Sequence, residues 1–183
     1  MEKELFSQPV MQKLKEENPT EYILYIWKME EIVRAFPSQD AFQKYYNDLL
    51  SDESNASLAA LLRGVYEELQ NENILDKASM HPQSIRDLLK ELEELHLKLL
   101  EDKREEIYQG LHLQVLPSII MLQKKNGTQA KGEIETCLEA IYGLHRLQST
   151  QQEVYPDTLE MLKKFSLLLK VLGEKRMTYN ENE

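Results

Sequence analysis

Apolar side chains recur at intervals of three and four residues along nearly the whole chain, and no segment alternates apolar with polar residues as a strand does. Positions at this spacing share one face of an α-helix. Only 6 Gly and 6 Pro interrupt the pattern, so long stretches are left without a helix breaker. The sequence therefore predicts an all-α protein.

Turn residues and helix caps divide this pattern into segments. After one turn around residues 9–15, we expect helices at 18–36, 38–50, 58–69, 83–99, 103–125, 134–144 and 156–172. Pro117 should kink or split the fifth of these. Short links between helices favour a single-domain antiparallel helical bundle of six or seven helices over residues 1–183, with about 1–8 and 178–183 frayed. The predicted core includes Tyr25, Ile26, Met29, Leu92, Leu95, Leu111, Ile141 and Leu169.

Charge and length exclude several classes of function. The 183 residues suit one domain, and a single cysteine, Cys137, cannot form a disulfide within the chain. The formal net charge of −10 repels phosphate backbones and anionic lipids. The apolar runs are far shorter than the roughly 20 residues of a membrane span. We expect a cytoplasmic protein that binds neither nucleic acid nor membrane.

The helix predicted at 18–36 has two faces. Its core face is an arc of roughly 120°, and a second arc beside it gathers Ile23, Trp27, Glu30 and Arg34. The simpler interpretation is a partly exposed ion pair beside a half-buried Trp. The alternative is that this face meets another helix or another subunit, because aromatic residues and Arg are enriched at the centres of interfaces. We therefore take these four residues as interface candidates.

The same segment carries a resemblance. Its sequence "EYILYIWKMEEIVRA" resembles the N-terminal signature of an uncharacterised bacterial family, a domain of unknown function from Bacteroidetes of about this length, through Asn18, Glu21, Tyr22, Leu24, Tyr25, Trp27, Glu30, Arg34 and Ala35. Pro19 and Thr20 stand where the family pattern has Ile-Ala. The resemblance covers residues 18–35 and implies a helical fold, but it brings no activity, cofactor or catalytic residue.

Three histidines stand on or beside apolar stripes, namely His96, His112 and His145. A buried neutral His that donates to a backbone carbonyl or a Tyr hydroxyl explains each one. Glu93 and His96 form one Glu-x-x-His pair of the kind used by di-metal carboxylate proteins, but the second copy is missing. A site for one metal ion would require the three histidine helices to converge.

Other catalytic motifs are incomplete in this sequence. Glu91 and Glu94 have the spacing of a helical magnesium site but lack the matching Glu-x-x-Asp, and Cys137 lies on an apolar stripe without a basic neighbour. We therefore expect a non-enzymatic bundle that acts through self-association, as a dimer, or through a protein partner, with no cofactor or metal. The alternative is a metal- or small-ligand-binding bundle, conceivably a hydrolase, that uses His96, His112 and His145.

Overall fold

A computed structural model describes residues 7–126 and 131–180, and within these ranges the chain is helical and contains no strand. The helices are α1 (Gln8–Glu17), α2 (Pro19–Arg34), α3 (Gln39–Leu50), the short 3-10 helix η2 (Glu53–Asn55), α4 (Ala56–Asn71), α5 (Gln83–Glu101), α6 (Glu106–Asn126), α7 (Glu133–Ser149) and α8 (Pro156–Asn180). The all-α prediction is confirmed. The described part has eight α-helices rather than six or seven, because α1 is a full helix where one turn was expected.

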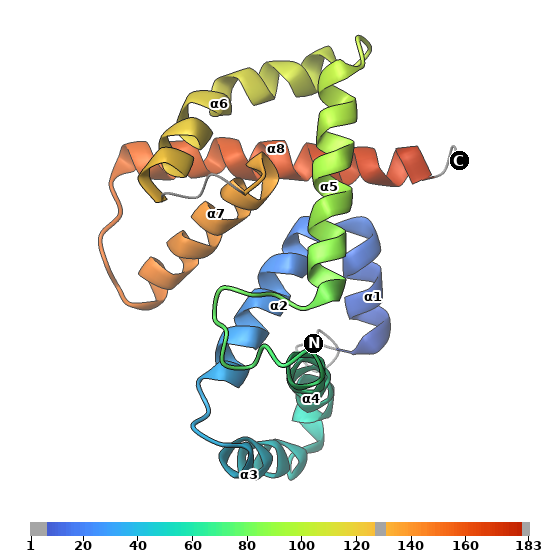
Figure 1. The fold of residues 1–183 in the computed structure, drawn as a ribbon, viewed down its shortest axis with the longest axis vertical. Coiled ribbons are helices and arrows are strands. Elements are labelled where there is room, and N and C mark those ends of the chain that lie inside the picture. The colour runs from blue at the N-terminus through green and yellow to red at the C-terminus, as the bar shows by residue number, and fades with distance from the viewer. Residues whose placement is uncertain (1–6, 127–130, 181–183) are drawn as a thin grey trace. The chain divides into compact units, whose positions relative to one another are not determined.

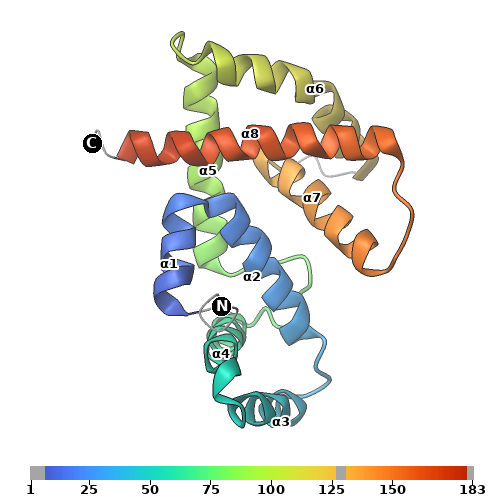
Figure 2. The same cartoon turned by 180° about the vertical axis from the view of Figure 1, so that it is seen from behind.

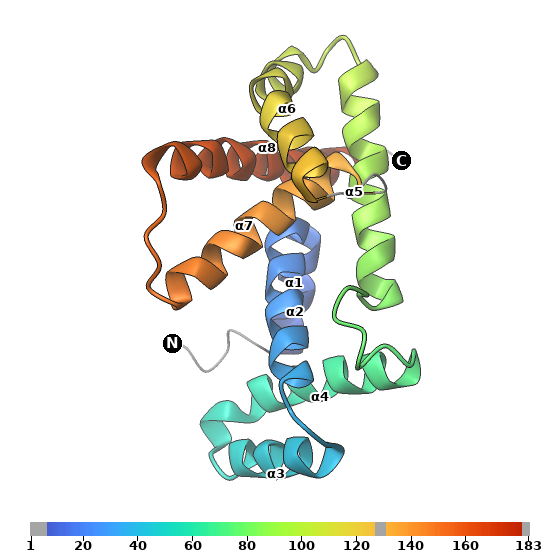
Figure 3. The same ribbon diagram turned by 60° about the vertical axis from the view of Figure 1, so that its left-hand side comes forward.

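The chain divides into two compact units, residues 1–86 and 87–183. In the first unit α2 packs against α1 and α4, and α3 packs against α4 (Figures 2 and 3). In the second unit α6, α7 and α8 pack against one another (Figure 1). Helix α5 begins in the first unit and continues into the second. The single-domain organisation stays a prediction.

Local signals set the helix ends. The Asn18 side chain accepts a hydrogen bond from the backbone N–H of Glu21 and donates one to the Glu21 carboxylate at 2.8 Å, so Asn18 caps the start of α2. Pro117 lies inside α6 without splitting it, since the helix continues to Asn126. Helix α8 extends beyond Leu172 to Asn180.

The cores consist mainly of the predicted stripes. Six members of the predicted core are buried, namely Ile26, Met29, Leu92, Leu95, Ile141 and Leu169. Tyr25 and Leu111 are only partly buried, because each lies at the edge of its helical face. In α6 the interior position beside Leu111 is taken by His112. None of the described helices is both long enough and apolar enough to cross a membrane.

Candidate metal centre

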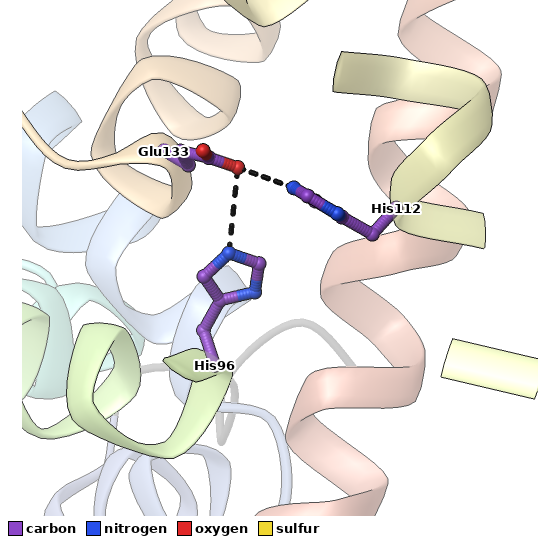
Figure 4. A group of neighbouring side chains, drawn as sticks. All are labelled: His96, His112 and Glu133. Atoms are coloured by element: carbon purple, nitrogen blue, oxygen red, sulfur yellow. Dashed lines mark hydrogen bonds and ion pairs between the residues drawn. The ribbon is translucent and has the colours of Figure 1, made fainter. Parts of the chain in front are cut away.

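Three helices of the second unit bring two histidines and one glutamate together (Figure 4). His96 belongs to α5, His112 to α6, and Glu133 is the first residue of α7. Each histidine occupies a position that faces the interior, so both are buried, whereas Glu133 stays about one third exposed. The hydrophobic packing of the helices therefore holds two imidazoles against one carboxylate.

The ligand atoms of these three side chains all lie within 4.8 Å of one another. Nε2 of His112 donates a hydrogen bond to Oε2 of Glu133 at 2.6 Å. Nε2 of His96 faces the same oxygen at 3.4 Å. Both imidazoles thus point toward a single carboxylate oxygen, as Figure 4 shows.

The other ring nitrogen of His96 is hydrogen-bonded to the hydroxyl of Tyr108 at 2.7 Å. Tyr108 is fully buried, and this burial raises the pKa of its phenol well above the ordinary value. The Tyr hydroxyl partner that the sequence predicts for a buried His is therefore confirmed for His96. Its Nε2 has no hydrogen-bond partner among the described residues although the side chain is only 1% exposed.

Glu93 fixes the start of α7. Its Oε1 accepts hydrogen bonds from the backbone N–H groups of Ile134 at 2.8 Å and Glu135 at 3.0 Å. A Cβ on Gly132 would lie only 2.0 Å from that oxygen, so a larger residue there would displace the Glu93 carboxylate from this position. The Glu93 carboxylate thus replaces the missing side-chain cap of α7 and orients the helix turn that carries Glu133.

The two carboxylates differ in their ionisation. Burial raises the pKa of Glu93, although the N–H of Glu135 and the nearby His96 act in the opposite direction. The pKa of Glu133 is lowered, first by its contact with His96 and also by His112, against the effect of burial. Glu133 is therefore held as the carboxylate, the form that binds a cation.

The separations are close to those of a metal site. A tetrahedral zinc ion with bonds of about 2.0 to 2.1 Å keeps its ligand atoms about 3.4 Å apart. The distance between His96 Nε2 and Glu133 Oε2 is 3.4 Å, whereas the 2.6 Å contact of His112 is a hydrogen bond that would have to open. The two imidazole nitrogens lie within 4.8 Å of each other, so reaching tetrahedral separations requires changes of up to about 1.4 Å.

The histidines predicted from sequence do not all meet. His96 and His112 come together, but the prediction that His145 is a buried histidine is wrong, because its side chain is exposed. The buried stripe of α7 ends at Ile141. His145 also lies twelve residues after Glu133 on α7, about 18 Å along the helix.

Glu133 was missed by the sequence analysis. Its only local signal is an acidic residue in the first turn of a helix, which is common because carboxylates are stabilised there. Cys137, one turn further along α7, is buried, as its assignment to the core predicted. Burial raises the pKa of its thiol, and the Glu133 and Glu93 carboxylates add to this effect.

The second face of α2 is buried within the first unit. Trp27 stacks on His81 with ring centroids 4.7 Å apart, and Glu30 is 1% exposed. Both Glu30 oxygens lie near Nδ1 of His81, at 3.0 and 3.2 Å, and Nη1 of Arg34 donates to Glu30 at 2.8 Å. Arg34 also donates to the carbonyl oxygens of Met80 at 2.6 Å and Ile74 at 3.4 Å.

The ion pair and Trp27 are therefore more deeply buried than the partly exposed pair and half-buried Trp of the simpler interpretation. The segment 74–81 of the same unit covers Trp27 and Glu30, and Ile23 is fully buried. The face thus meets the chain's own loop, so these aromatic and charged residues are explained without a second subunit. His81 was missed because it lies in a loop, 51 residues from Glu30.

A protein-family model described as "Domain of unknown function (DUF4924)" matches residues 9–183. The match extends far beyond the segment 18–35 on which the sequence resemblance rests. No curated protein and no solved structure matches the chain.

Proposed function

We propose that this chain, which belongs to the DUF4924 family of unknown function, binds one divalent transition-metal ion in its second unit. The ligands are Nε2 of His96, Nε2 of His112 and a carboxylate oxygen of Glu133. The observation that carries the proposal is the convergence of these three atoms, within 4.8 Å, from three separate helices.

The surrounding contacts support it. A ligand histidine commonly has its second ring nitrogen hydrogen-bonded, and Tyr108 makes this bond to His96. Nε2 of His96 is buried and makes only the 3.4 Å contact with Glu133, which is longer than an ordinary hydrogen bond, and an ion between the two would give it a direct partner. Glu93 and Gly132 in turn position Glu133.

The donor atoms indicate the class of metal. Two imidazole nitrogens and one carboxylate suit Zn²⁺ or Fe²⁺, whereas Mg²⁺ and Ca²⁺ prefer sites made entirely of oxygen. The association function expected from the sequence is therefore the less supported of the two alternatives. The metal-binding alternative is retained with Glu133 in place of His145.

Metal content tests the proposal. Purified protein is stripped with a chelator, reloaded with Zn²⁺, dialysed, and analysed by elemental mass spectrometry. We expect one equivalent in the wild type and in His145→Ala, and a loss of most of it in His112→Ala and Glu133→Ala. Because His145 is exposed on the same unit, His145→Ala is the matched control. No bound metal in the wild type, or equal loss in His145→Ala, would refute the proposal.

Self-association is the second candidate. Helix α6 exposes Leu113, Ile120 and Met121, at 68%, 40% and 55% exposure, and the first two are seven residues apart and so lie on one side of the helix. A second copy of the chain could cover them through a two-fold contact. Light scattering of Leu113→Ser, with Gln114→Ser as the exposed control, tests this reading. A monomeric wild type would exclude it.

A further inference from the structure

On the premise of the proposed function, we propose that the ion held by His96, His112 and Glu133 keeps an exchangeable coordination position on its solvent side. Water or hydroxide fills this position, and small anionic ligands replace it. The centre would then belong to the catalytic class of metal sites, in which three protein ligands leave one position open, rather than to the closed structural class.

The open position is inferred first from the number of available ligands. Over residues 7–126 and 131–180, the group that can hold an ion contains three side chains, one fewer than a four-coordinate ion requires. The nearby groups have other partners, since Glu93 Oε1 accepts two backbone N–H groups and Tyr108 is bonded to His96. The Sγ of Cys137 is not among the ligand atoms of this group.

The exposure of the ligands indicates where solvent can reach the ion. The side chains of His96 and His112 are 1% and 10% exposed, whereas 32% of the Glu133 side chain is exposed. Solvent therefore reaches the centre from the side of the carboxylate and not from the side of the imidazoles. A ligand from solution therefore has to approach beside Glu133 at the start of α7.

Charge indicates the class of ligand. With neutral imidazoles, Glu133 cancels one of the two charges of the ion. The second carboxylate, Glu93, is engaged with the positive end of the α7 helix, so its charge is compensated there. An anion of single charge neutralises the centre. When no such anion is present, a water in this position would be acidified by the ion, and after losing one proton to the solvent it would be hydroxide, the nucleophile of hydrolytic metal sites.

Cobalt substitution tests this inference. Co²⁺ is loaded in place of zinc, and azide or acetate is titrated while the visible absorption spectrum is recorded. We expect 1:1 binding of Co²⁺ and a saturable change of the spectrum with either anion, in the wild type and in His145→Ala. Cys137→Ser should give the same spectra, because we assign the thiol no bond to the metal.

The outcomes separate the two proposals. If Co²⁺ binds but neither anion alters the spectrum, the open position is refuted while the metal-binding function stands. A sulfur-to-cobalt charge-transfer band that disappears in Cys137→Ser would also refute it, since the thiol would then close the site. If Co²⁺ does not bind at all, the proposed function itself is refuted.

Discussion

Glu30 is a buried carboxylate that forms an ion pair with Arg34 and also contacts His81. Replacing Arg34 by Ala removes the hydrogen bonds to Glu30 and to the Met80 carbonyl at once. Since loss of one partner from a buried pair costs about 3 to 5 kcal/mol, we expect Arg34→Ala to lower the free energy of unfolding by about 3 kcal/mol. Urea denaturation measures the change.

The matched control is Lys28→Ala, because Lys28 lies on the same helix and is exposed. It should change stability by less than about 0.5 kcal/mol. Light scattering should give the same mass for the wild type, Arg34→Ala and Lys28→Ala, since the Trp27 face is covered by the chain itself. Dissociation of an oligomer by Arg34→Ala would instead restore the interface hypothesis.

The lowered pKa of Glu133 gives a pH-dependent prediction. A carboxyl with a lowered pKa in the folded state stabilises the fold above its unfolded pKa, and this contribution is lost as the pH falls through the folded value. In metal-free protein, Glu133→Gln should therefore be less stable than the wild type at neutral pH. The difference should shrink below the ordinary pKa range of glutamate. Thermal melts at pH 7 and pH 3.5 measure it, and a difference that grows in acid would contradict the assignment.

At the scale of elements, the start of α7 depends on the fit between Gly132 and Glu93. Alanine at position 132 places a methyl group 2.0 Å from Glu93 Oε1 and must displace the carboxylate. The φ of Gly132 is −65°, so alanine has no backbone strain and the cost comes from this contact alone. We expect Gly132→Ala to lower stability by about 1 to 3 kcal/mol and to weaken metal binding about tenfold or more.

A double-mutant cycle isolates this contact. Glu93→Ala removes both the cap and the atom with which the new methyl collides, so Gly132→Ala should cost little in that background. Chemical denaturation of the two single variants and the double variant gives the coupling energy. Additive losses would mean that Gly132 matters for a reason other than Glu93.

Elements were more predictable than contacts. The helix cap at Asn18 and the stripe on α5 depend on residues three or four apart, so local sequence determines them. The pairing of His112 with Glu133 spans 21 residues and that of His81 with Glu30 spans 51, so both depend on how the helices pack. His145 follows the apolar period of α7 but lies beyond the point where that helix is buried. Periodicity alone cannot locate such a point.

At the scale of the whole molecule, the single-domain prediction can be tested with two probes. Trp27 is the only tryptophan and reports on the first unit, whereas the candidate metal centre lies in the second. Helix α5 is continuous across the boundary, so we expect the units to unfold together. Zn²⁺ at 100 times its Kd stabilises the folded state by about 2.7 kcal/mol. Zinc should then raise the melting temperature by the same amount whether unfolding is followed by Trp fluorescence or by circular dichroism.

Unequal shifts would contradict that prediction. If zinc raises the transition seen by circular dichroism but leaves the Trp27 transition in place, the two units unfold independently. His112→Ala serves as the control, because neither signal should then respond to zinc.

The central claim concerns two of the four histidines in the chain, and nuclear magnetic resonance distinguishes all four. Long-range ¹H–¹⁵N correlation spectra report the state of each ring nitrogen of His81, His96, His112 and His145, before and after one equivalent of Zn²⁺. We predict that the Nε2 signals of His96 and His112 move to metal-bound shifts while those of His81 and His145 stay in place. Unchanged spectra for His96 and His112, or a response confined to the exposed His145, would contradict the metal centre.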